Sequence, residues 1–502
     1  MHATQCSTVD PMANHIRAKY TAVIGLEVHA QLSLQRKLFS PEAAVYGALP
    51  NTQMSLVTLA HPGTLPRLNR QAVAYAIKMG LACHAKITRE NFFARKNYFY
   101  PDLPKGYQIT QDKTPICQEG YITIDTQDGH EKEIALQRIH LEEDTGKSIH
   151  GLVEEETLLD FNRAGVALIE IVTKPVLKTS AEAYSLLTEI RRLVRYLDIC
   201  DGNMEEGSLR CDANISVMYK DAVTLGQRVE VKNMNSIRHV QLAIEHEIDR
   251  QIAVLEGGGR VVGETRAYDA AQQTTTSLRT KETLNDYRYF PEPDLPPLVV
   301  SEAWIAQLQQ AMPLLPRACF KKFTNTYQLS AYDAGVLTED KDIALFFEEL
   351  CQLTLHYKAA ANWMIGPVKA YLNESTLSIK AFPLQLTVLA TLIALVEQGQ
   401  LSFSVASQKL YPALLAQPDQ SPLALAQALN LLQEKDEDKI HALVAEVMAA
   451  YPAKVAAYRK GKKGLLGMLM GEVMKKSQGK VAPQVASNLL RQRLENTDDI
   501  VH

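Results

Sequence analysis

Carboxylates and imidazoles occur in three short stretches whose spacing suits a metal site. The string VIGLEVH puts Glu27 and His29 two residues apart, so both lie on one face if the stretch is a strand. LIEIV sets Glu170 among apolar residues, where a buried acid needs a cation or hydrogen bonds, and HLEED holds Glu142 among three adjacent acids. Oxygen-rich ligands with at most one imidazole suit Mg²⁺ or Mn²⁺ better than zinc. Each acid alone is more simply interpreted as a surface residue, whereas the set favours a metal site.

Two further stretches alternate polar and apolar residues with the period of a strand. In SLRCDANISV the apolar residues stand at the odd positions, and the polar ones include Arg210 and Asp212. RVEVK repeats the pattern with Glu230 and Lys232 on its polar face. If these strands pair, their polar faces form a wall with both charge signs. A solvated outer face of a sheet explains the alternation equally well.

Some chemistries are excluded by what the motifs lack. Gly146, Lys147 and Ser148 resemble the end of a P-loop, but Leu141 stands where that motif requires glycine. The sequence also has no G-x-S-x-G elbow and no Gly/Ser-rich stretch of the kind that serine amidases use for their nucleophile. Any nucleotide chemistry here therefore belongs to a different fold.

The composition is that of a globular protein with several cores. The 502 residues allow about three domains, and 46% hydrophobic with 22% charged residues excludes disordered and fibrous classes. No apolar run approaches the ~20 residues of a membrane span, and the first 19 residues resemble neither a signal nor a transit peptide. The sequence thus predicts a soluble, cytoplasmic protein. Its seven scattered cysteines contain no C-x-x-C pair, which predicts reduced, mostly buried thiols rather than disulfides or structural zinc.

Charge is concentrated at one end of the chain. Residues 454–493 hold ten Lys and Arg against one acid, Glu472, so this segment carries +9. Because the whole chain carries −4, the remainder carries −13. A basic tail on an acidic body indicates a polyanion partner at that end, with a solvated helical face as the alternative.

Periodicity predicts an α+β fold that changes character along the chain. Residues 21–32 and 208–217 alternate as strands, and 180–198 and 236–256 have helical spacing, the former with a capping-box pattern at Thr179 and Glu182. Four prolines within 290–297 predict a boundary, after which the sequence is almost wholly helical.

The predicted organisation has four parts. An extension (1–19) precedes a strand-rich domain (20–298), an all-α helical domain (299–410) and a small, basic helical tail (411–502).

Six strings together carry a resemblance to a known family. They occur in the order VIGLEVH (23–29), HPGTLP (61–66), RKNYFYPD (95–102), LEEDTGKS (141–148), EEGSLRCDAN (205–214) and DYRYFPEPD (286–294). They resemble the GatB family, the B subunits of the tRNA-dependent amidotransferases, and the resemblance runs from about Tyr20 to the C-terminus. It implies a cradle domain, a helical domain and a tail similar to the YqeY protein.

The resemblance also implies an activity and partners. Such subunits convert misacylated Glu-tRNA(Gln) or Asp-tRNA(Asn) to the amide form, and either substrate or both fit this sequence. ATP phosphorylates the side-chain carboxylate, and ammonia then displaces phosphate. Ammonia comes through a tunnel from the glutaminase subunit, GatA, and a small third subunit, GatC, completes the heterotrimer. No membrane partner is implied.

The family's functional positions can be transferred residue by residue. The Mg²⁺ ligands fall on Glu27, His29, Glu142 and Glu170, and the nucleotide-handling region on Glu205, Glu206, Arg210, Asp212 and Lys232. Charge and motif position make Lys96, Arg266 and Arg279 expected phosphate contacts, and Lys460, Lys462 and Lys463 expected tRNA contacts in the tail.

One departure from the family and two rival interpretations bear on this assignment. Many relatives bind zinc with early C-x-C and C-x-x-C pairs, but here those stretches are FSP (39–41) and SLVT (55–58), so zinc is not expected. One rival interpretation is a tRNA-binding scaffold without catalysis. Such a scaffold would not need the four metal ligands, so their presence argues against it. The other rival interpretation is the related archaeal protein, which carries an extra domain between the cradle and helical domains. Residues 291–304 leave no room for such a domain here.

Overall fold

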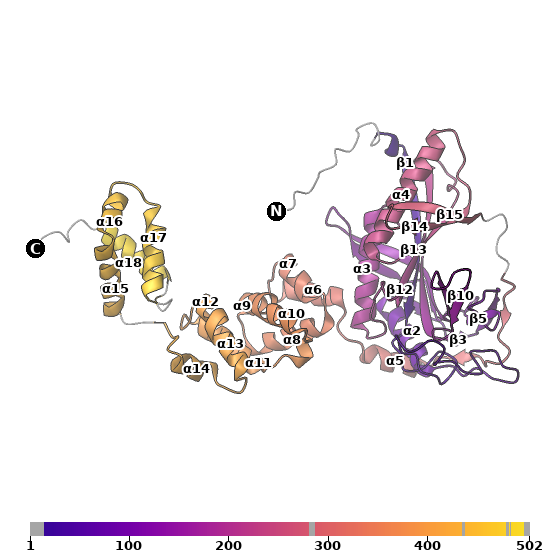
Figure 1. Cartoon of the computed structure of the whole chain (residues 1–502), viewed down its shortest axis with the longest axis horizontal. Helices are drawn as coiled ribbons and strands as arrows, with labels where there is room; N and C mark the ends of the chain where they lie inside the picture. The colour runs from indigo at the N-terminus through magenta and orange to yellow at the C-terminus, as the bar shows by residue number, and fades with distance from the viewer. Residues whose placement is uncertain (1–14, 281–286, 434–436, 478–480, 482, 496–502) are drawn as a thin grey trace, which may run out of the picture. The chain divides into compact units, whose positions relative to one another are not determined.

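A computed structural model describes residues 15–280, 287–433, 437–477, 481 and 483–495 of the chain (Figure 1). The chain forms two compact units, one ending at Leu315 and the other beginning at Pro316, and each is described by itself. The first unit is strand-rich and the second helical, so the predicted α+β class is confirmed. The division at 315 lies beyond the predicted boundary at 298.

A 13-stranded sheet forms the first unit, and ten of its strands follow one another across it. Their order is β15 (Thr274–Thr280), β14 (Glu264–Asp269), β13 (Val229–Met234), β12 (Leu209–Tyr219), β1 (Tyr20–Gln31), β11 (Ala167–Thr173), β8 (Glu131–Glu143), β5 (Tyr107–Thr110), β4 (Ala94–Asn97) and β16 (Phe290–Pro291). Neighbours on this path are antiparallel except β13 and β14, which are parallel.

Shorter strands complete the unit. Three join the sheet off this path: β6 (Cys117–Gln118) and β7 (Tyr121–Asp125) pair with β8, and β2 (Lys86–Ile87) pairs with β6. Two small ladders pair β9 (Lys147–His150) with β10 (Thr157–Asp160), and β3 (Glu90–Asn91) with β17 (Leu298–Val299).

Helices cover one face of the sheet (Figure 1). They are α2 (Arg70–Ala82), α3 (Ser180–Tyr196) and α4 (Ile237–Glu256). The predicted cap of α3 is confirmed, because the Glu182 N–H donates to Thr179 Oγ1 at 3.1 Å. From 209 to 217 the apolar odd positions of β12 face these helices and are 3% exposed or less, which leaves the even, polar positions on the opposite face.

A fourth helix, α5 (Glu302–Gln310), also belongs to the first unit. Its Trp304, Ile305 and Leu308 pack against the sheet core, and the Arg70 guanidinium lies 5.0 Å from the Trp304 ring centroid. This packing places the end of the compact unit after α5.

The second unit is built from helices joined by short connections. They are α6 (Pro316–Asn325), α7 (Ala331–Leu337), α8 (Lys341–Leu353), α9 (Tyr357–Trp363), η1 (Met364–Val368), α10 (Lys369–Ser375), η2 (Ile379–Ala381), α11 (Leu386–Glu397), α12 (Phe403–Val405), η3 (Ala406–Leu410), α13 (Tyr411–Ala416) and α14 (Pro422–Ala428). The run from α12 to α13 crosses the predicted boundary at 410 without a break. Tyr411 packs against Trp363 with their ring centroids 5.7 Å apart.

The tail has a core of its own. Its helices are α15 (Glu437–Ala450), α16 (Pro452–Arg459), α17 (Leu465–Lys476) and α18 (Pro483–Glu495). Val444, Val447, Leu469 and Val473 are fully buried among them, and the partly buried Leu465, Leu466 and Met470 pack against this core.

Two expectations about the whole chain can also be compared with the structure. Six cysteines are buried and unpaired, as predicted, and Cys6 lies outside the described residues. In the parts of the chain that the structure describes, no single helix is long and apolar enough to span a membrane. Helices 438–450 and 452–459 reach that length and composition only when taken together, across a 92° bend.

Candidate active site

The polar face of the central strands forms a continuous wall with both charge signs. Strand register sets Glu27 opposite Asp212, and His29 between Glu170 on β11 and Arg210 on β12. The two alternating stretches do pair, because β12 runs antiparallel to β13. Residues directly opposite on neighbouring strands point to the same face. Strands β1, β11 and β12 thus place charged side chains on one surface.

A hollow of about 630 Å³ opens on this wall and is called the large hollow below. Its lining combines acids, imidazoles and cations, with two tyrosines, Tyr287 and Tyr289, beside them. The charged and imidazole side chains are Glu27, Glu142, Glu170, Asp212, Glu230, His29, His140, Lys96, Arg138, Arg228 and Lys232. Such a dense mixture of titratable groups in a cleft is typical of an active site.

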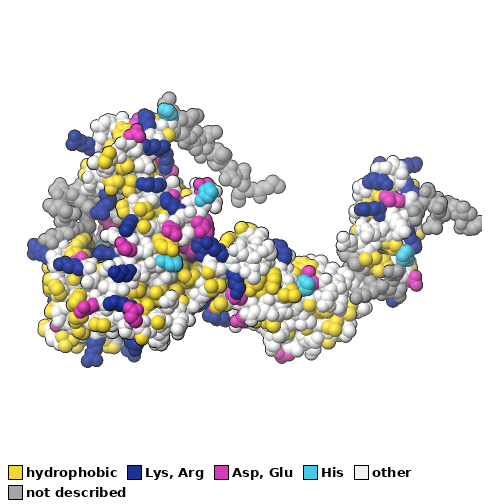
Figure 2. All heavy atoms as spheres, turned by 180° about the vertical axis from the view of Figure 1, so that it is seen from behind, with side chains coloured by type: hydrophobic (Ala, Val, Ile, Leu, Met, Phe, Trp, Pro, Cys, Tyr) yellow, Lys and Arg dark blue, Asp and Glu magenta, His cyan; other side chains and the backbone are white. Residues whose placement is uncertain are grey.

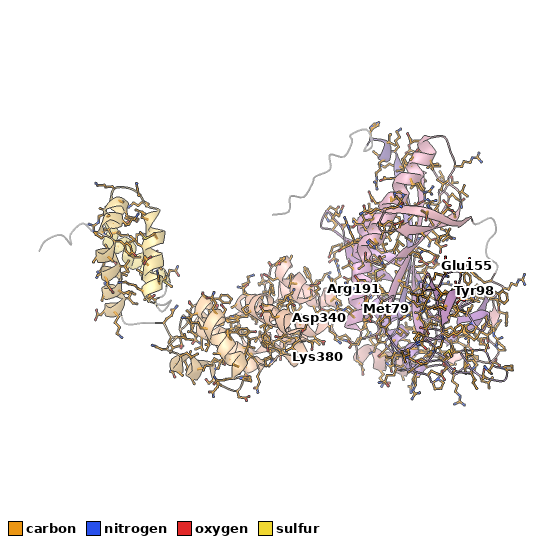
Figure 3. All side chains as sticks on the ribbon, in the orientation of Figure 1. Met79, Tyr98, Glu155, Arg191, Asp340 and Lys380 are labelled. Atoms are coloured by element: carbon orange, nitrogen blue, oxygen red, sulfur yellow. The ribbon has the colours of Figure 1, made fainter. Side chains whose placement is uncertain are left out.

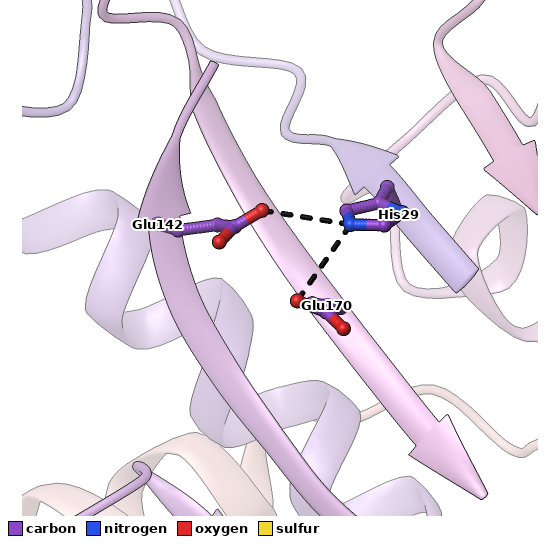
Figure 4. Close-up of side chains that lie close together, drawn as sticks. All are labelled: His29, Glu142 and Glu170. Atoms are coloured by element: carbon purple, nitrogen blue, oxygen red, sulfur yellow. Dashed lines mark ion pairs between the residues drawn. The ribbon is translucent and has the colours of Figure 1, made fainter. Parts of the chain in front are cut away.

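Three of the predicted metal ligands converge in this hollow. One oxygen each of Glu142 and Glu170 lies 3.6 Å from His29 Nε2, and the three ligand atoms lie within 4.8 Å of one another (Figure 4). We call His29, Glu142 and Glu170 the histidine group. Thr110 Oγ1 donates to Glu142 Oε2 at 3.3 Å, and His140 Nε2 lies 3.1 Å from Glu170 Oε2. Thr110 and His140 therefore orient the two carboxylates.

Charge compensation dominates the histidine group. Burial alone would lower the pKa of His29, but the hydrogen bond and charge of Glu170, with the charge of Glu142, raise it to about 9. Burial would raise the pKa of Glu170, yet His140 and His29 hold it well below its usual range. The protonated His29 imidazole thus compensates the charge of the two acids. A bound cation would supply the same compensation.

The fourth predicted ligand, Glu27, lies in a different cluster. One oxygen each of Glu27, Asp212 and Glu230 lies within 4.8 Å of the others, and we call these three the acidic group. Asn214 Nδ2 donates to Glu27 Oε1 at 2.9 Å, and Lys232 Nζ contacts Asp212 and lies 3.1 Å from Glu230 Oε1. Burial, and next the neighbouring acids Glu170, Glu230 and Asp212, raise the pKa of Glu27. A nearby divalent cation would stabilise the charged form of a carboxylate crowded in this way.

A second hollow of about 590 Å³ shares His29, Lys96, Glu142, Asp212 and Lys232 with the first. It adds Arg210, whose Nη2 donates to Asp144 Oδ2 at 2.8 Å, and Asp144 also accepts from Gln31 Nε2 at 2.8 Å. Burial would raise the pKa of Asp144, but Arg210 and Arg163 lower it. Asp144 thereby fixes the Arg210 guanidinium beside the second hollow.

Comparisons with known proteins identify the family to which the chain belongs. Residues 22–306 match the family model described as the GatB/GatE catalytic domain, and residues 345–494 match one described as the GatB domain. The chain belongs to the GatB/GatE family. The resemblance drawn from the six strings is thereby confirmed.

Relatives of this GatB/GatE chain match along nearly its whole length. The B subunit of the aspartyl/glutamyl-tRNA(Asn/Gln) amidotransferase from Synechococcus sp. (strain JA-3-3Ab) is 45% identical over 95% of this chain and 98% of the relative. The subunits of the same name from Nitrosococcus oceani and Halorhodospira halophila are 46% and 47% identical, over 95% of this chain and 100% of each relative.

The structure places the three expected phosphate contacts of this GatB/GatE chain differently. Lys96 lines both hollows. Arg266 stands beside Val231 and so points to the helix-covered face, where its guanidinium binds Glu264 and Thr275. A phosphate contact from Arg266 in the hollows is therefore not supported. The backbone of Arg279 lies in β15, and its side chain lies outside the described residues.

Glu205 and Glu206 are not brought to the wall. Both are exposed on the loop before β12, and their N–H groups donate to Asn203 Oδ1 at 3.0 and 3.3 Å. Glu205 instead lines a separate hollow of about 470 Å³ with Arg191 and Arg195. The other three residues of the predicted nucleotide-handling region, Arg210, Asp212 and Lys232, do line the second hollow.

Three functional candidates were missed in the sequence. Glu230 was recognised only as polar, because its place beside Glu27 depends on the strand order. His140 and Asp144 stand in the HLEED string, where Asp144 is one of the three adjacent acids but only Glu142 is an expected metal ligand. The signal for His140 was present, because His140 and Glu142 share the same two-residue spacing as Glu27 and His29.

The two stretches where the resemblance implies zinc ligands, residues 39–41 and 55–58, hold other interactions here. The Phe39 ring packs edge-on against Phe93 at 5.3 Å, and the Thr58 N–H donates to Ser55 Oγ at 3.1 Å. These side chains offer neither thiolate nor imidazole.

In the tail, the three expected tRNA contacts are exposed around the turn between α16 and α17. Lys463 Nζ lies 4.4 Å from the Tyr458 ring centroid and 3.9 Å from Glu495 Oε1. Figure 2 shows several Lys and Arg side chains over these tail helices.

Proposed function

We propose that this chain is the kinase and transamidase component of a heterotrimeric tRNA-dependent amidotransferase. It takes Glu-tRNA(Gln), Asp-tRNA(Asn) or both, and it works in the cytoplasm with the glutaminase GatA and the small protein GatC. The observation that carries the proposal is the convergence of the histidine group, the acidic group, Lys96 and Lys232 in one hollow. Membership of the GatB/GatE family supports it independently.

The reaction divides into two displacements at one carboxyl group. An oxygen of the aminoacyl carboxylate attacks the γ-phosphorus of ATP, and ADP leaves. Ammonia then attacks the activated carbonyl, phosphate leaves and an amide forms, with one proton lost from nitrogen. Lys96 and Lys232 neutralise charge on phosphoryl oxygens, and Arg210 aligns an anionic group in the second hollow.

The donor set fits Mg²⁺. Five carboxylates and one imidazole supply the hard oxygen ligands that this ion prefers, and the raised pKa of Glu27 reflects negative charge that a cation would offset. His29, Glu142 and Glu170 would hold one ion, and Glu27, Asp212 and Glu230 a second. A bound ion supplies charge neutralisation for phosphoryl transfer. Zinc is not part of the proposal, because the family's zinc-ligand positions hold no cysteine.

The test uses the complete heterotrimer and each misacylated tRNA. With ATP and either glutamine or ammonium chloride, it should amidate at least one substrate, whereas this chain alone should release no ammonia from glutamine. Glu142→Gln and Glu170→Gln should abolish tRNA-dependent ATP hydrolysis. Glu133→Gln, on the same strand β8 but exposed, is the matched control and should retain it. Glutaminase activity of the isolated chain, or wild-type hydrolysis by both active-site variants, would overturn the assignment.

A further inference from the structure

Four tyrosine rings form a continuous row at the rim of the two hollows. In order they are Tyr100, Tyr98, Tyr287 and Tyr289, with successive ring centroids 6.0, 6.1 and 5.9 Å apart and interplanar angles of 69°, 72° and 71°. We call them the tyrosine row. Its residues come from two segments about 190 positions apart in the chain, and Tyr98 is labelled in Figure 3.

The two segments are locked together. β16 pairs with β4, and the Asn97 side chain donates to the carbonyls of Tyr287 and Arg288 at 3.3 and 2.8 Å. Arg95 binds Glu292 through two parallel hydrogen bonds of 2.7 and 2.9 Å. The row is therefore preorganised, which lowers the entropic cost of binding to it.

Packing alone does not account for the row. Its outer rings, Tyr100 and Tyr289, are 57% and 40% exposed, and the flanking Phe99 and Phe290 are 89% and 45% exposed. Single exposed aromatics are ordinary, but a contiguous exposed run marks an interaction site.

The position of the row indicates what it binds. Tyr287 and Tyr289 line the large hollow and Tyr98 lines the second, so a molecule on the row extends into both. Lys96 Nζ lies 4.9 Å from the Tyr287 ring centroid and 5.9 Å from that of Tyr98, which places one cation beside the inner rings. Flat aromatic faces with an adjacent cation recognise unpaired bases by stacking, without preference for one base.

We propose that the tyrosine row binds the unpaired 3′ nucleotides of the substrate RNA and so guides the aminoacyl group into the hollows. The proposal rests on the proposed function, because it takes the substrate to be an amino acid esterified to the terminal ribose of an RNA. The bases stack on Tyr100 and Tyr289, while the ester and its side chain continue past Lys96 to the histidine group. This surface is separate from the lysines of the tail.

The test measures stacking directly in the intact heterotrimer. The substrate RNA carries 2-aminopurine in place of its terminal adenine, because the fluorescence of this base is quenched when it stacks. Wild-type complex should quench it, and Tyr100→Ala, Tyr289→Ala and the double variant should lose most of the quenching. The KM for the misacylated tRNA should rise about fivefold to a hundredfold per ring removed, with the KM for ATP unchanged.

Companion variants separate stacking from bulk and from folding. Tyr100→Trp should keep the quenching and a low KM, whereas Tyr100→Leu, which keeps apolar area without an aromatic face, should not. Tyr332→Ala removes a tyrosine that is 74% exposed in the second unit and should behave as wild type. Thermal unfolding midpoints within a degree or two of wild type would show that the outer tyrosines are not needed for folding.

Each contrary outcome overturns the proposal. Unchanged quenching and tRNA KM in the double variant would show that the row does not bind RNA. A raised KM for ATP alone would assign the row to the adenine of the nucleotide, and dissociation of the heterotrimer on gel filtration would assign it to a protein interface. Failure of the wild-type complex to amidate any tRNA would instead refute the proposed function.

Discussion

His140 Nε2 lies 3.1 Å from Glu170 Oε2 and 3.7 Å from Glu142 Oε2, so one buried imidazole contacts both carboxylates of the histidine group. Burial would lower the pKa of His140, but the charge of Glu170 and the hydrogen bonds to both acids raise it. The imidazole thus orients the carboxylates and stands behind the face that a cation would bind.

His140→Asn should therefore weaken Mg²⁺ binding without removing a proposed ligand. Loss of such a supporting contact typically costs about 10- to 100-fold in metal affinity. The Mg²⁺ concentration for half-maximal tRNA-dependent ATP hydrolysis should rise by that factor, and excess Mg²⁺ should restore most of the rate. His130→Asn, at an exposed position before β8, is the control. A lower rate that no Mg²⁺ concentration restores would contradict a positioning role.

The separation of the histidine and acidic groups predicts two cations per chain. Each group supplies three ligand atoms, and the remaining positions around Mg²⁺ are available to water or phosphate oxygens. With Mn²⁺ as the probe and a nonhydrolysable ATP analogue present, electron paramagnetic resonance should count two bound ions. Glu170→Gln and Glu230→Gln should each reduce the count to one, while Glu133→Gln should leave it at two. One ion in the wild-type chain would support a single shared site.

Much of the fold could be predicted because it depends on local patterns. The alternation of SLRCDANISV fixed which side chains of β12 are buried, and the Thr179–Glu182 cap marked the start of α3 within a residue. The clustering of possible metal ligands was indicated in part by Glu27 and His29, an acid and an imidazole two residues apart on a strand. These signals need only the period of the element and its ends.

The grouping of the side chains could not be predicted, because it depends on which strands lie side by side. β1 lies between β11 and β12, so His29 meets Glu170 on one side while Glu27 meets Asp212 on the other. Likewise, the face taken by Arg266 follows from its register with Val231 in a parallel pair that periodicity does not reveal. A one-residue shift in register would have placed Arg266 on the polar wall.

The raised pKa of His29 predicts that metal binding depends on pH. Because that pKa is about 9, the imidazole is protonated at pH 7 and must lose a proton before it can bind a cation. Mg²⁺ affinity should therefore rise about tenfold per pH unit up to about pH 9 and then level off. Calorimetric titration in buffers of different ionisation enthalpy should detect about one proton released at pH 7. His29→Gln should abolish this release, and a pH-independent affinity in the wild-type chain would contradict the prediction.

The Arg266 network predicts a loss of stability rather than of nucleotide binding. Arg266 Nη1 donates to Glu264 at 2.6 Å, and Arg266 Nε lies 3.6 Å from the fully buried Glu247. Arg266→Met leaves both acids less compensated, and breaking a buried pair costs about 3–5 kcal/mol. Its thermal midpoint should fall while the KM for ATP stays unchanged.

Lys96→Met is the comparison, because Lys96 lines both hollows, and it should raise the KM for ATP. An Arg266 variant with wild-type stability and a raised KM for ATP would show that Arg266 contributes to nucleotide binding.

The exposed lysines of the tail predict a salt-dependent share of tRNA affinity. Each phosphate neutralised contributes about 0.9 to the slope of log affinity against log salt, so replacing Lys460, Lys462 and Lys463 by Gln should flatten that slope by about three. Filter binding from low to physiological salt measures it. The control carries the same charge change on the first unit, at the exposed lysines Lys86, Lys178 and Lys220. A slope changed equally by both triple variants would show that net charge, and not the tail surface, attracts the RNA.

Removing the tail should have the same effect, provided that the chain is cut in the right place. A cut at Leu410 would break the run from α12 to α13 and remove Tyr411, which packs against Trp363. The buried tail core begins only at Ile440. A chain ending at Gln433 should therefore keep its helical unit and lose the salt-dependent affinity. Ammonia-dependent amidation at saturating tRNA should decline less than affinity does, because the proposed chemistry lies in the sheet unit. Unchanged affinity and slope in this shortened chain would show that the basic run is a solvated face.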